Sequence, residues 1–174
     1  MYRVSDMVVY PGHGVARISR IVTQSIGKTT VQFFELTFLN KDLTILVPVE
    51  KANSIGLRAL SSPEHIESAF RALAKPLRPI SHYELTASNW NKRSKAYAQS
   101  RDSGDLIRLI EMYRELLHIA QKKELSFGEK SLLQQTEMLL AQEISIVKKA
   151  QEETTIEQLR ILIQQANQSG TSLV

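Results

Sequence analysis

Residues 8–22 read VVYPGHGVARISRIV, which has the composition of a β-strand, a tight turn and a second β-strand in direct succession. The turn PGHG (11–14) contains two glycines and a proline, the residues that best accept the backbone angles of tight turns. In the run that follows, apolar and polar residues alternate, as in a strand with one buried face. From this alternation we expect Arg17 and Ile21 on one side of the strand, and Ile18 and Arg20 on the other.

Further short β-rich runs follow this stretch. SIGKTT (25–30) supplies a Gly-centred turn typical of a hairpin, and it leads into VQFFELTFL (31–39). A third run, LTILVPV (43–49), comes after another turn. Strands this short and this closely spaced predict a small barrel or a strongly bent sheet over residues 1–58. Because such a domain has little interior, we do not expect an enzyme pocket in it.

From residue 62 onward the apolar residues recur with the 3.6-residue period of helices. Ser62 and Pro63 predict a helix start, with serine as the cap and proline at the first helical position. The fourth and fifth expected helices begin with capping boxes, Ser126 with Glu129 and Thr154 with Glu157. The five expected helices cover approximately residues 62–75, 88–104, 105–122, 126–150 and 154–167. Residues 75–88 contain two prolines and predict a linker wrapped on the surface.

These patterns predict an α+β protein, with a β domain over residues 1–58, a compact all-α domain over 59–168 and a frayed tail at 169–174. The chain has no cysteine, so disulfides, thiolate metal sites and a cysteine nucleophile are excluded. The histidines are widely spaced and show no metal-ligand pattern; they are His13, His65, His82 and His118. No phosphate-binding glycine loop and no Ser–His–Asp arrangement is present. We therefore expect no enzyme, no metal and no cofactor.

The chain lacks the features of a membrane or exported protein. No apolar run approaches the roughly 20 residues that a membrane-spanning helix needs. The first residues, MYRVSDMVVY, contain no apolar stretch typical of a signal peptide. We therefore expect a cytoplasmic protein without a membrane partner.

Positive charge is concentrated in one segment. Residues 71–101 contain seven Lys or Arg against the single acidic residue Glu84, a net charge of +6, whereas the whole chain carries +4. Local positive charge of this kind attracts polyanions such as nucleic acid. The alternative is an ordinary solvated helix face, which the charge pattern alone does not exclude.

Within this segment, residues 89–97 read NWNKRSKAY and contain the only tryptophan of the chain, Trp90. Lysine and arginine supply salt-dependent attraction to the DNA backbone, and an aromatic wedge can insert at a base step in the minor groove. On a helix, Trp90 shares a face with Arg93 and Tyr97. The candidate DNA-contacting residues are Asn89, Trp90, Lys92, Arg93 and Lys95. The alternative, which the pattern leaves open, is that Trp90 packs into the helical core against Tyr97 and Leu106.

Four stretches together resemble the CarD/CdnL family of bacterial transcription regulators. They are VVYPGHGVA (8–16), DLTILVPVEKANSIGLR (42–58), NWNKRSKAY (89–97) with SGD (103–105), and LSFGEKSLLQQTEMLL (125–140). Their order and spacing cover nearly the whole chain, except that the resemblance is weakest beyond residue 150. The N-terminal half also resembles the polymerase-binding module of the transcription-repair coupling factor.

The resemblance implies an N-terminal Tudor-like β-barrel that docks on the β-subunit lobe of RNA polymerase. It also implies a helical domain that contacts promoter DNA, without sequence specificity, just upstream of the melted region. There the family tryptophan, here Trp90, wedges into the minor groove and slows collapse of the open complex. Some members carry arginine at the positions of Gln24 and Leu46, where they contact polymerase. The departure at both positions implies a differently built interface, for which Arg17, Arg20 or an edge strand are the candidate substitutes.

Two other function classes stay open from the sequence. One is a protein–protein adaptor with a buried Trp90 and an incidental basic patch, and the other is a general nucleic-acid binder that acts without polymerase. We expect a monomer, because each half can bury its own apolar face. Which promoters respond, in which direction, and what the helix beyond residue 150 does are not encoded in these patterns.

Overall fold

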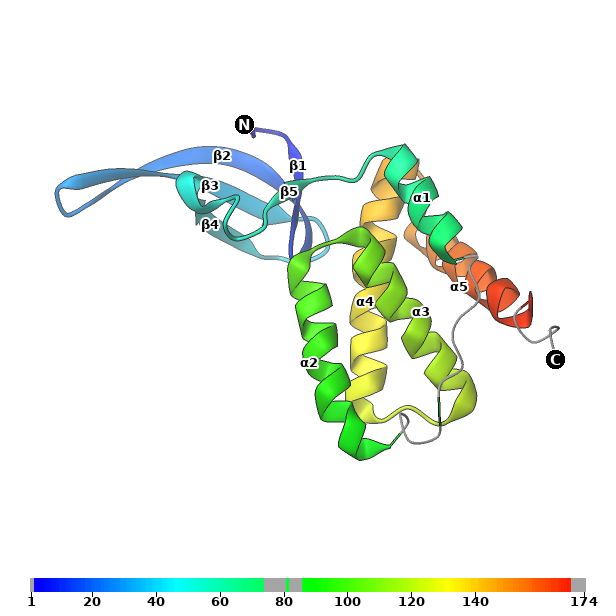
Figure 1. The fold of residues 1–174 in the computed structure, drawn as a ribbon. Coiled ribbons are helices and arrows are strands. Elements are labelled where there is room, and N and C mark those ends of the chain that lie inside the picture. The colour runs from blue at the N-terminus through cyan, green and yellow to red at the C-terminus, as the bar shows by residue number, and fades with distance from the viewer. Residues whose placement is uncertain (1, 74–80, 82–85, 170–174) are drawn as a thin grey trace. The chain divides into compact units, whose positions relative to one another are not determined.

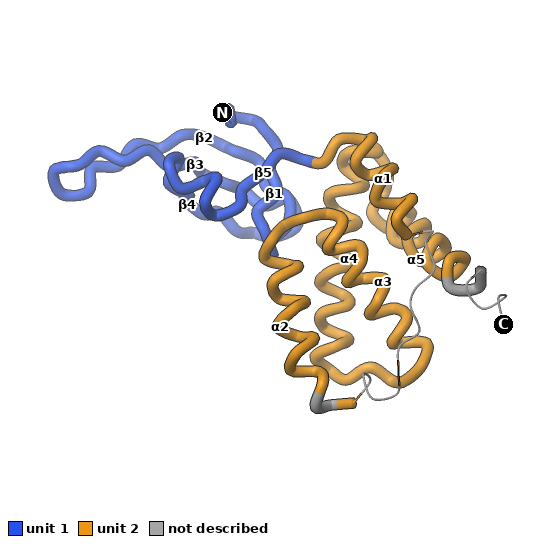
Figure 2. The backbone as a smooth tube through the Cα atoms, in the orientation of Figure 1, with its two compact units in different colours: residues 1–60 blue, residues 61–174 orange. Residues whose placement is uncertain are grey.

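The structure is a computed structural model, and it describes residues 2–73, 81 and 86–169. The chain divides into two compact units, residues 1–60 and residues 61–174 (Figure 2). The first contains an antiparallel sheet and the second contains helices, which confirms the predicted α+β class. Most of the predicted linker at 75–88 lies outside the described residues, and so do residues 170–174 of the predicted tail.

The sheet of the first unit has five strands in the order β4-β3-β2-β1-β5, with antiparallel neighbours (Figure 1). The strands are β1 (Met7–Tyr10), β2 (Gly14–Ile26), β3 (Thr29–Phe38), β4 (Thr44–Pro48) and β5 (Arg58–Ala59). The predicted strands and the PGHG turn are confirmed. Both glycines of the turn have positive φ, 72° at Gly12 and 101° at Gly14, a conformation that costs glycine little.

The Tudor-like barrel is not confirmed, because the sheet is open, with β4 and β5 as its edges. One edge strand, β5, has only two residues and pairs with β1 alone among the described strands. The chain between β4 and β5 forms the 3-10 helix η1 (Val49–Lys51) and turns instead of another strand. Ala52 and Leu57 from this segment are buried in the core of the unit, and the Tyr2 hydroxyl donates to the Leu57 carbonyl at 2.8 Å. The turns between β4 and β5 therefore cover the interior of the unit, at the place where a closed barrel would need further strand pairing.

A β-bulge in β2 changes which side chains face solvent. The pairing with β3 runs from Ile18↔Leu36 directly to Arg20↔Glu35, so one residue of β2 is extra. An extra residue shifts the alternation of side chains between the two faces of a strand. The prediction that Arg20 shares a side with Ile18 is therefore wrong. Arg20 lies on the opposite face, together with Arg17, whose partner on β3 is two residues from Glu35.

The helices of the second unit are α1 (Pro63–Leu73), α2 (Ala87–Ser103), α3 (Leu106–Lys122), α4 (Phe127–Lys148) and α5 (Glu152–Ser169). The central helix α3 supplies Tyr113, the largest fully buried side chain of the described residues, and its neighbours α2 and α4 lie beside it (Figure 1). Tyr113 is fully buried, and its hydroxyl donates to Glu137, which also binds Arg160 of α5 through two hydrogen bonds of 2.8 Å. This contact joins three helices of the core.

Three of the predicted helix boundaries are confirmed. Ser62 caps α1, because its Oγ accepts a hydrogen bond from the His65 N–H at 3.1 Å. Gly104 ends α2 in the left-handed conformation, with φ of 65°. The capping box of α4 is present, with both hydrogen bonds between Ser126 and Glu129.

Two helix starts differ from the sequence prediction. The first helical residue of α2 is Ala87, one residue before the expected start at 88, and Thr86 takes the cap position. The last helix begins at Glu152, and the predicted capping box of Thr154 is wrong. The reason is that the N–H and the hydroxyl of Thr155 both donate to the Gln151 carbonyl, which places the first turn earlier.

Candidate functional sites

Trp90 lies in the first turn of α2, as predicted, and its side chain is half-buried at the edge of the helical core. Its ring centroid is 6.4 Å from that of Tyr97. It also lies against Gly128 of α4, where an added Cβ would stand 3.2 Å from the indole Cζ2. The indole therefore occupies space that any side chain at residue 128 would enter. One side of the indole is packed and the rest is open to solvent, so both alternatives for Trp90 stay predictions.

The predicted face shared by Trp90, Arg93 and Tyr97 is turned inward. Tyr97 is only 5% exposed and belongs to the apolar core of the unit. Lys92 and Lys95 lie on the other side of α2, and both are exposed. Amphipathic helices bury one stripe and leave the opposite side to solvent, so these two lysines are available for a polyanion. Asn89, in the first turn, is half-buried.

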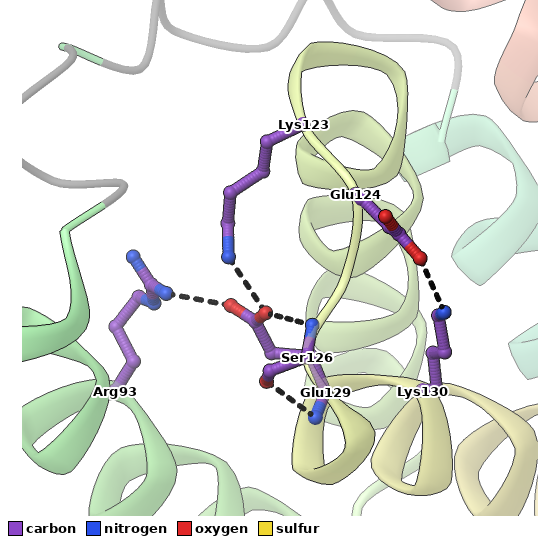
Figure 3. A network of polar contacts seen from close by, with 6 residues as sticks. All are labelled: Arg93, Lys123, Glu124, Ser126, Glu129 and Lys130. Atoms are coloured by element: carbon purple, nitrogen blue, oxygen red, sulfur yellow. Dashed lines mark hydrogen bonds and ion pairs between the residues drawn. The ribbon is translucent and has the colours of Figure 1, made fainter.

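Arg93 takes part in a buried ionic network at the start of α4 (Figure 3). Its Nη2 lies 2.9 Å from Oε1 of Glu129, and the two side chains are 13% and 2% exposed. The other carboxylate oxygen of Glu129 accepts from Lys123 Nζ at 2.7 Å and from the Ser126 N–H at 2.9 Å. One carboxylate thus connects α2, the end of α3 and the start of α4.

Glu129 is charged despite its burial. Burial alone would raise the pKa of its carboxyl, but the hydrogen bonds from Lys123 and Ser126 outweigh burial and lower this pKa below its usual range. A carboxylate at the third position of a helix is also favoured by the positive end of the helix dipole. The network therefore keeps the ionised Glu129 carboxylate next to α2, the helix that carries Trp90.

Sequence reasoning missed Phe127, the first residue of α4. Its side chain is 89% exposed, the highest value among the large apolar side chains of the described residues. Phe127 directly precedes Gly128, so a second aromatic side chain begins next to the residue that contacts Trp90. The signal was present in the sequence. Ser126 and Glu129 define the helix start, and a residue between a cap and the first full turn has few core neighbours.

The four candidate polymerase-contacting residues lie on one exposed face of the sheet. Directly opposed residues of neighbouring strands share a face, and Arg20, Glu35 and Leu46 form such a row across β2, β3 and β4. Arg17 and Gln24 belong to the same face, since their β3 partners are separated from Glu35 by even numbers of residues. Arg17, Arg20 and Gln24 are exposed, and Leu46 is 41% exposed. The bulge in β2 is what unites the two arginines.

Arg20 has a partner on this face. Its Nε and Nη2 donate to Oε2 of Glu35 at 3.0 and 2.8 Å. The arginine side chain is nevertheless 70% exposed, so the pair contributes little to stability and leaves the guanidinium accessible. Beside this pair, the apolar side chains of Val22, Phe33 and Pro48 lie half-buried on the same face.

Two features are absent from the described residues. No group of three or more histidines and acidic residues is arranged to hold a metal ion in the part of the chain that the structure describes. Within those same residues, no helix combines the length and the apolar character that crossing a membrane requires.

Comparison with known proteins gives matches to both units. A family model described as the CarD-like/TRCF RID domain matches residues 2–61, and one described as CarD, C-terminal domain, matches residues 80–160. A protein of Bacillus subtilis (strain 168) named "Putative transcription factor YdeB" is 23% identical over 149 residues, which cover 85% of this chain and 93% of YdeB. The matched domains are regulatory, and together they define a transcription-associated regulator of the kind that interacts with RNA polymerase. With both domains in the expected order, the chain belongs to the CarD/CdnL family.

Proposed function

We propose that this protein is a non-enzymatic transcription regulator that binds RNA polymerase with its sheet and promoter DNA with its helical unit. The polymerase contact is the β-subunit lobe, and the DNA contact lies just upstream of the melted region, where it stabilises the open complex. The observation that carries the DNA part is the half-open indole of Trp90 at the start of a helix that also exposes Lys92 and Lys95.

The DNA surface combines charge with aromatic contact. Lys92 and Lys95 supply the phosphate attraction, and the positive end of α2 adds to it. The exposed part of Trp90 is the minor-groove wedge, and Phe127 offers a second apolar side chain next to it. Insertion is favoured where base pairs are already unstacked, as at the edge of a bubble. No helix with a row of base-reading side chains is required, so binding does not depend on the base sequence.

Arg93 and Asn89 are also assigned to the DNA surface, but their expected roles differ from those of the two lysines. The Arg93 guanidinium lies 5.9 Å from the centre of the Trp90 ring and is ion-paired with Glu129. An arginine in that position supports the indole on the side away from the DNA. If it also contacts a phosphate, its guanidinium is shared between that phosphate and the Glu129 carboxylate. Asn89 directly precedes Trp90 in the first helical turn, and we assign it to the DNA backbone beside the wedge.

The polymerase surface is the exposed face of the sheet that carries Arg17, Arg20, Gln24 and Leu46. Its two arginines lie on the middle strand β2, its exposed leucine lies on the edge strand β4, and half-buried apolar side chains lie beside them. Interfaces commonly combine apolar contacts with arginine, so this face has a suitable composition. The two arginines of β2 offset the absence of arginine at residues 24 and 46.

The test of the DNA contact is the lifetime of open promoter complexes formed by the cognate polymerase. Wild-type protein is expected to prolong the lifetime, and Trp90→Ala is expected to lose most of this effect. The matched control is Phe70→Ala, which removes another half-buried aromatic from the same core without touching α2. If Trp90→Ala remains folded and prolongs the lifetime as wild type does, the wedge is refuted.

The polymerase contact is tested by binding to the isolated β-subunit lobe. Leu46→Glu places a carboxylate in the proposed face and is expected to weaken binding at least tenfold. Leu43→Glu is the matched control, because Leu43 has nearly the same exposure, 38% against 41%, but precedes β4 and lies outside the row. Equal loss in both variants, or in neither, would contradict the assignment of this face.

The inward orientation of Tyr97, on the Trp90 side of α2, favours one competing function, a protein–protein adaptor in which Trp90 serves the core. An adaptor would show no DNA affinity that depends on salt. A regulator of the proposed kind shows affinity that falls steeply as salt rises. We expect a monomer for the adaptor and for the regulator, because each unit encloses its own apolar core.

A further inference from the structure

We propose that Glu129 and Gly128 are positioning residues for Trp90, which hold the indole in its half-open pose before any DNA is present. Neither residue carries exposed charge towards a ligand, since Glu129 is 1% exposed and Gly128 has no side chain. Their consequence for transcription rests on the proposed function, whereas their effect on the indole does not.

Glu129 determines how α2 lies on the start of α4. Arg93 follows Trp90 by three residues, so it lies on the same side of α2, about one helical turn away. The Arg93–Glu129 ion pair of 2.9 Å therefore anchors the turn next to the indole. Glu129 is itself held by Lys123 and by the capping box with Ser126, so the anchor point cannot shift without loosening the α4 start.

Gly128 sets the depth at which the indole packs. The three indole atoms nearest to an added Cβ at residue 128 are Cζ2 at 3.2 Å, Cε2 at 3.8 Å and Nε1 at 3.9 Å. A separation of 3.2 Å is below ordinary carbon–carbon contact, so either the indole or the helix start must move. No positive φ is required here, because Gly128 is the second residue of α4. Space alone explains the glycine.

The pose is thus defined on three sides. Tyr97 closes one side of the indole, Gly128 another, and the Arg93 guanidinium lies 5.9 Å from the ring centre. A side chain already held in its bound orientation loses less conformational freedom on binding than a mobile one. A wedge of this kind therefore gains from residues that never touch the DNA.

The first test uses the free protein and its single tryptophan as the reporter. Glu129→Gln removes the charge that Arg93 and Lys123 share while keeping an amide oxygen for the Ser126 N–H. We expect red-shifted indole emission, at least twofold faster quenching by acrylamide, and a weaker near-ultraviolet dichroism signal from the indole. Glu124→Gln is the matched control, because Glu124 forms an exposed pair with Lys130 at the same helix start and does not join the network. Its indole spectra are expected to equal those of wild type.

The second test is Gly128→Ala, which leaves the hydrogen-bonding groups of the Glu129 network unchanged and is expected to stay folded even if Glu129→Gln does not. Alanine has the higher helix propensity, so this variant does not weaken α4 through its backbone. We again expect a red shift and faster quenching, because the methyl group displaces the indole. If the emission, quenching and dichroism of Gly128→Ala equal those of wild type, or Glu129→Gln changes them no more than Glu124→Gln does, the positioning role is overturned.

The functional consequence is measured separately. Gly128→Ala is expected to shorten open-complex lifetimes severalfold relative to wild type while binding the β-subunit lobe normally. If the indole spectra change in both variants but Trp90→Ala leaves the lifetime at the wild-type value, the wedge fails and the positioning role stands. If Trp90→Ala shortens the lifetime and the spectra of both variants stay at wild type, the positioning role fails and the wedge stands.

Discussion

Replacing Arg93 with alanine should destabilise the helical unit, whereas replacing Lys92 should not, although the two residues are neighbours in one basic cluster. Arg93 is 13% exposed and ion-paired with a carboxylate that is 2% exposed. Lys92 is exposed on the other side of α2. The contrast tests whether the Glu129 network is a structural element of this unit.

The size of this destabilisation depends on the hydrogen bonds that Glu129 keeps in the variant. After Arg93→Ala, the carboxylate still accepts from Lys123 and from the Ser126 N–H, so it is not left without partners. The cost is therefore below the 3–5 kcal/mol typical of a buried charge that loses its only counterion, and nearer that of one charged hydrogen bond, about 2 kcal/mol. For a domain of this size, 1 kcal/mol corresponds to roughly 4 °C in Tm, which gives a decrease of roughly 8 °C.

The assay is thermal unfolding of the full chain followed by circular dichroism at the helix band. We expect Lys92→Ala to unfold within roughly 2 °C of wild type, as surface substitutions usually do. A double variant with Glu129→Gln should lose less than the sum of the two single losses, because both changes remove the same ion pair. An Arg93→Ala protein that unfolds at the wild-type temperature would refute the energetic importance of the network.

Three further outcomes are expected. Gly104→Ala should cost about 1 kcal/mol, because the residue ends α2 with φ of 65°, and unchanged unfolding in denaturant would contradict this. Lys92→Ala and Lys95→Ala should each lower the slope of log K against log salt for duplex DNA by about one, while Lys28→Ala, in the other unit, should leave the slope unchanged. Because the pKa of Glu129 is lowered in the folded chain, its contribution to stability is fully present above the unfolded pKa of about 4.3 and is lost as pH falls through the lower folded value. The difference in Tm between wild type and Glu129→Gln should therefore be largest at neutral pH and shrink towards pH 3, and a constant difference would contradict the assigned charge.

Local sequence signals predicted most of the architecture. The glycines of PGHG, the capping box of Ser126 with Glu129 and the helix-ending Gly104 each have short-range physical causes, and the structure contains all three. The second capping box failed for an equally local reason, since Thr155 bonds back to Gln151 and starts the helix two residues before Thr154. Patterns of this kind identify possible caps, and competition between neighbouring candidates decides which one is used.

Features that depend on distant residues could not be read in the same way. The bulge in β2 follows from pairing with β3, and without that partner the alternation placed Arg17 and Arg20 on opposite faces. The open sheet has the same kind of cause, because residues 49–57 fold into turns whose buried side chains complete the interior. The sequence pattern indicates that side chains alternate between the two faces of a strand. The pairing register with the neighbouring strand determines which face each side chain occupies.

The basic cluster around Trp90 shows why composition alone overstates a binding site. Three basic residues follow the tryptophan within five positions, and charge counting gives them equal weight. The helical period separates them, since Lys92 and Lys95 lie outward while Arg93 lies on the Trp90 side and meets a carboxylate 36 residues further along the chain. The three basic residues after Trp90 thus divide into an exposed pair, Lys92 and Lys95, and Arg93, which lies on the side of α2 that carries the indole. A wedge needs both attraction to DNA and a fixed orientation. A loosely held aromatic side chain would move aside instead of separating the stacked bases.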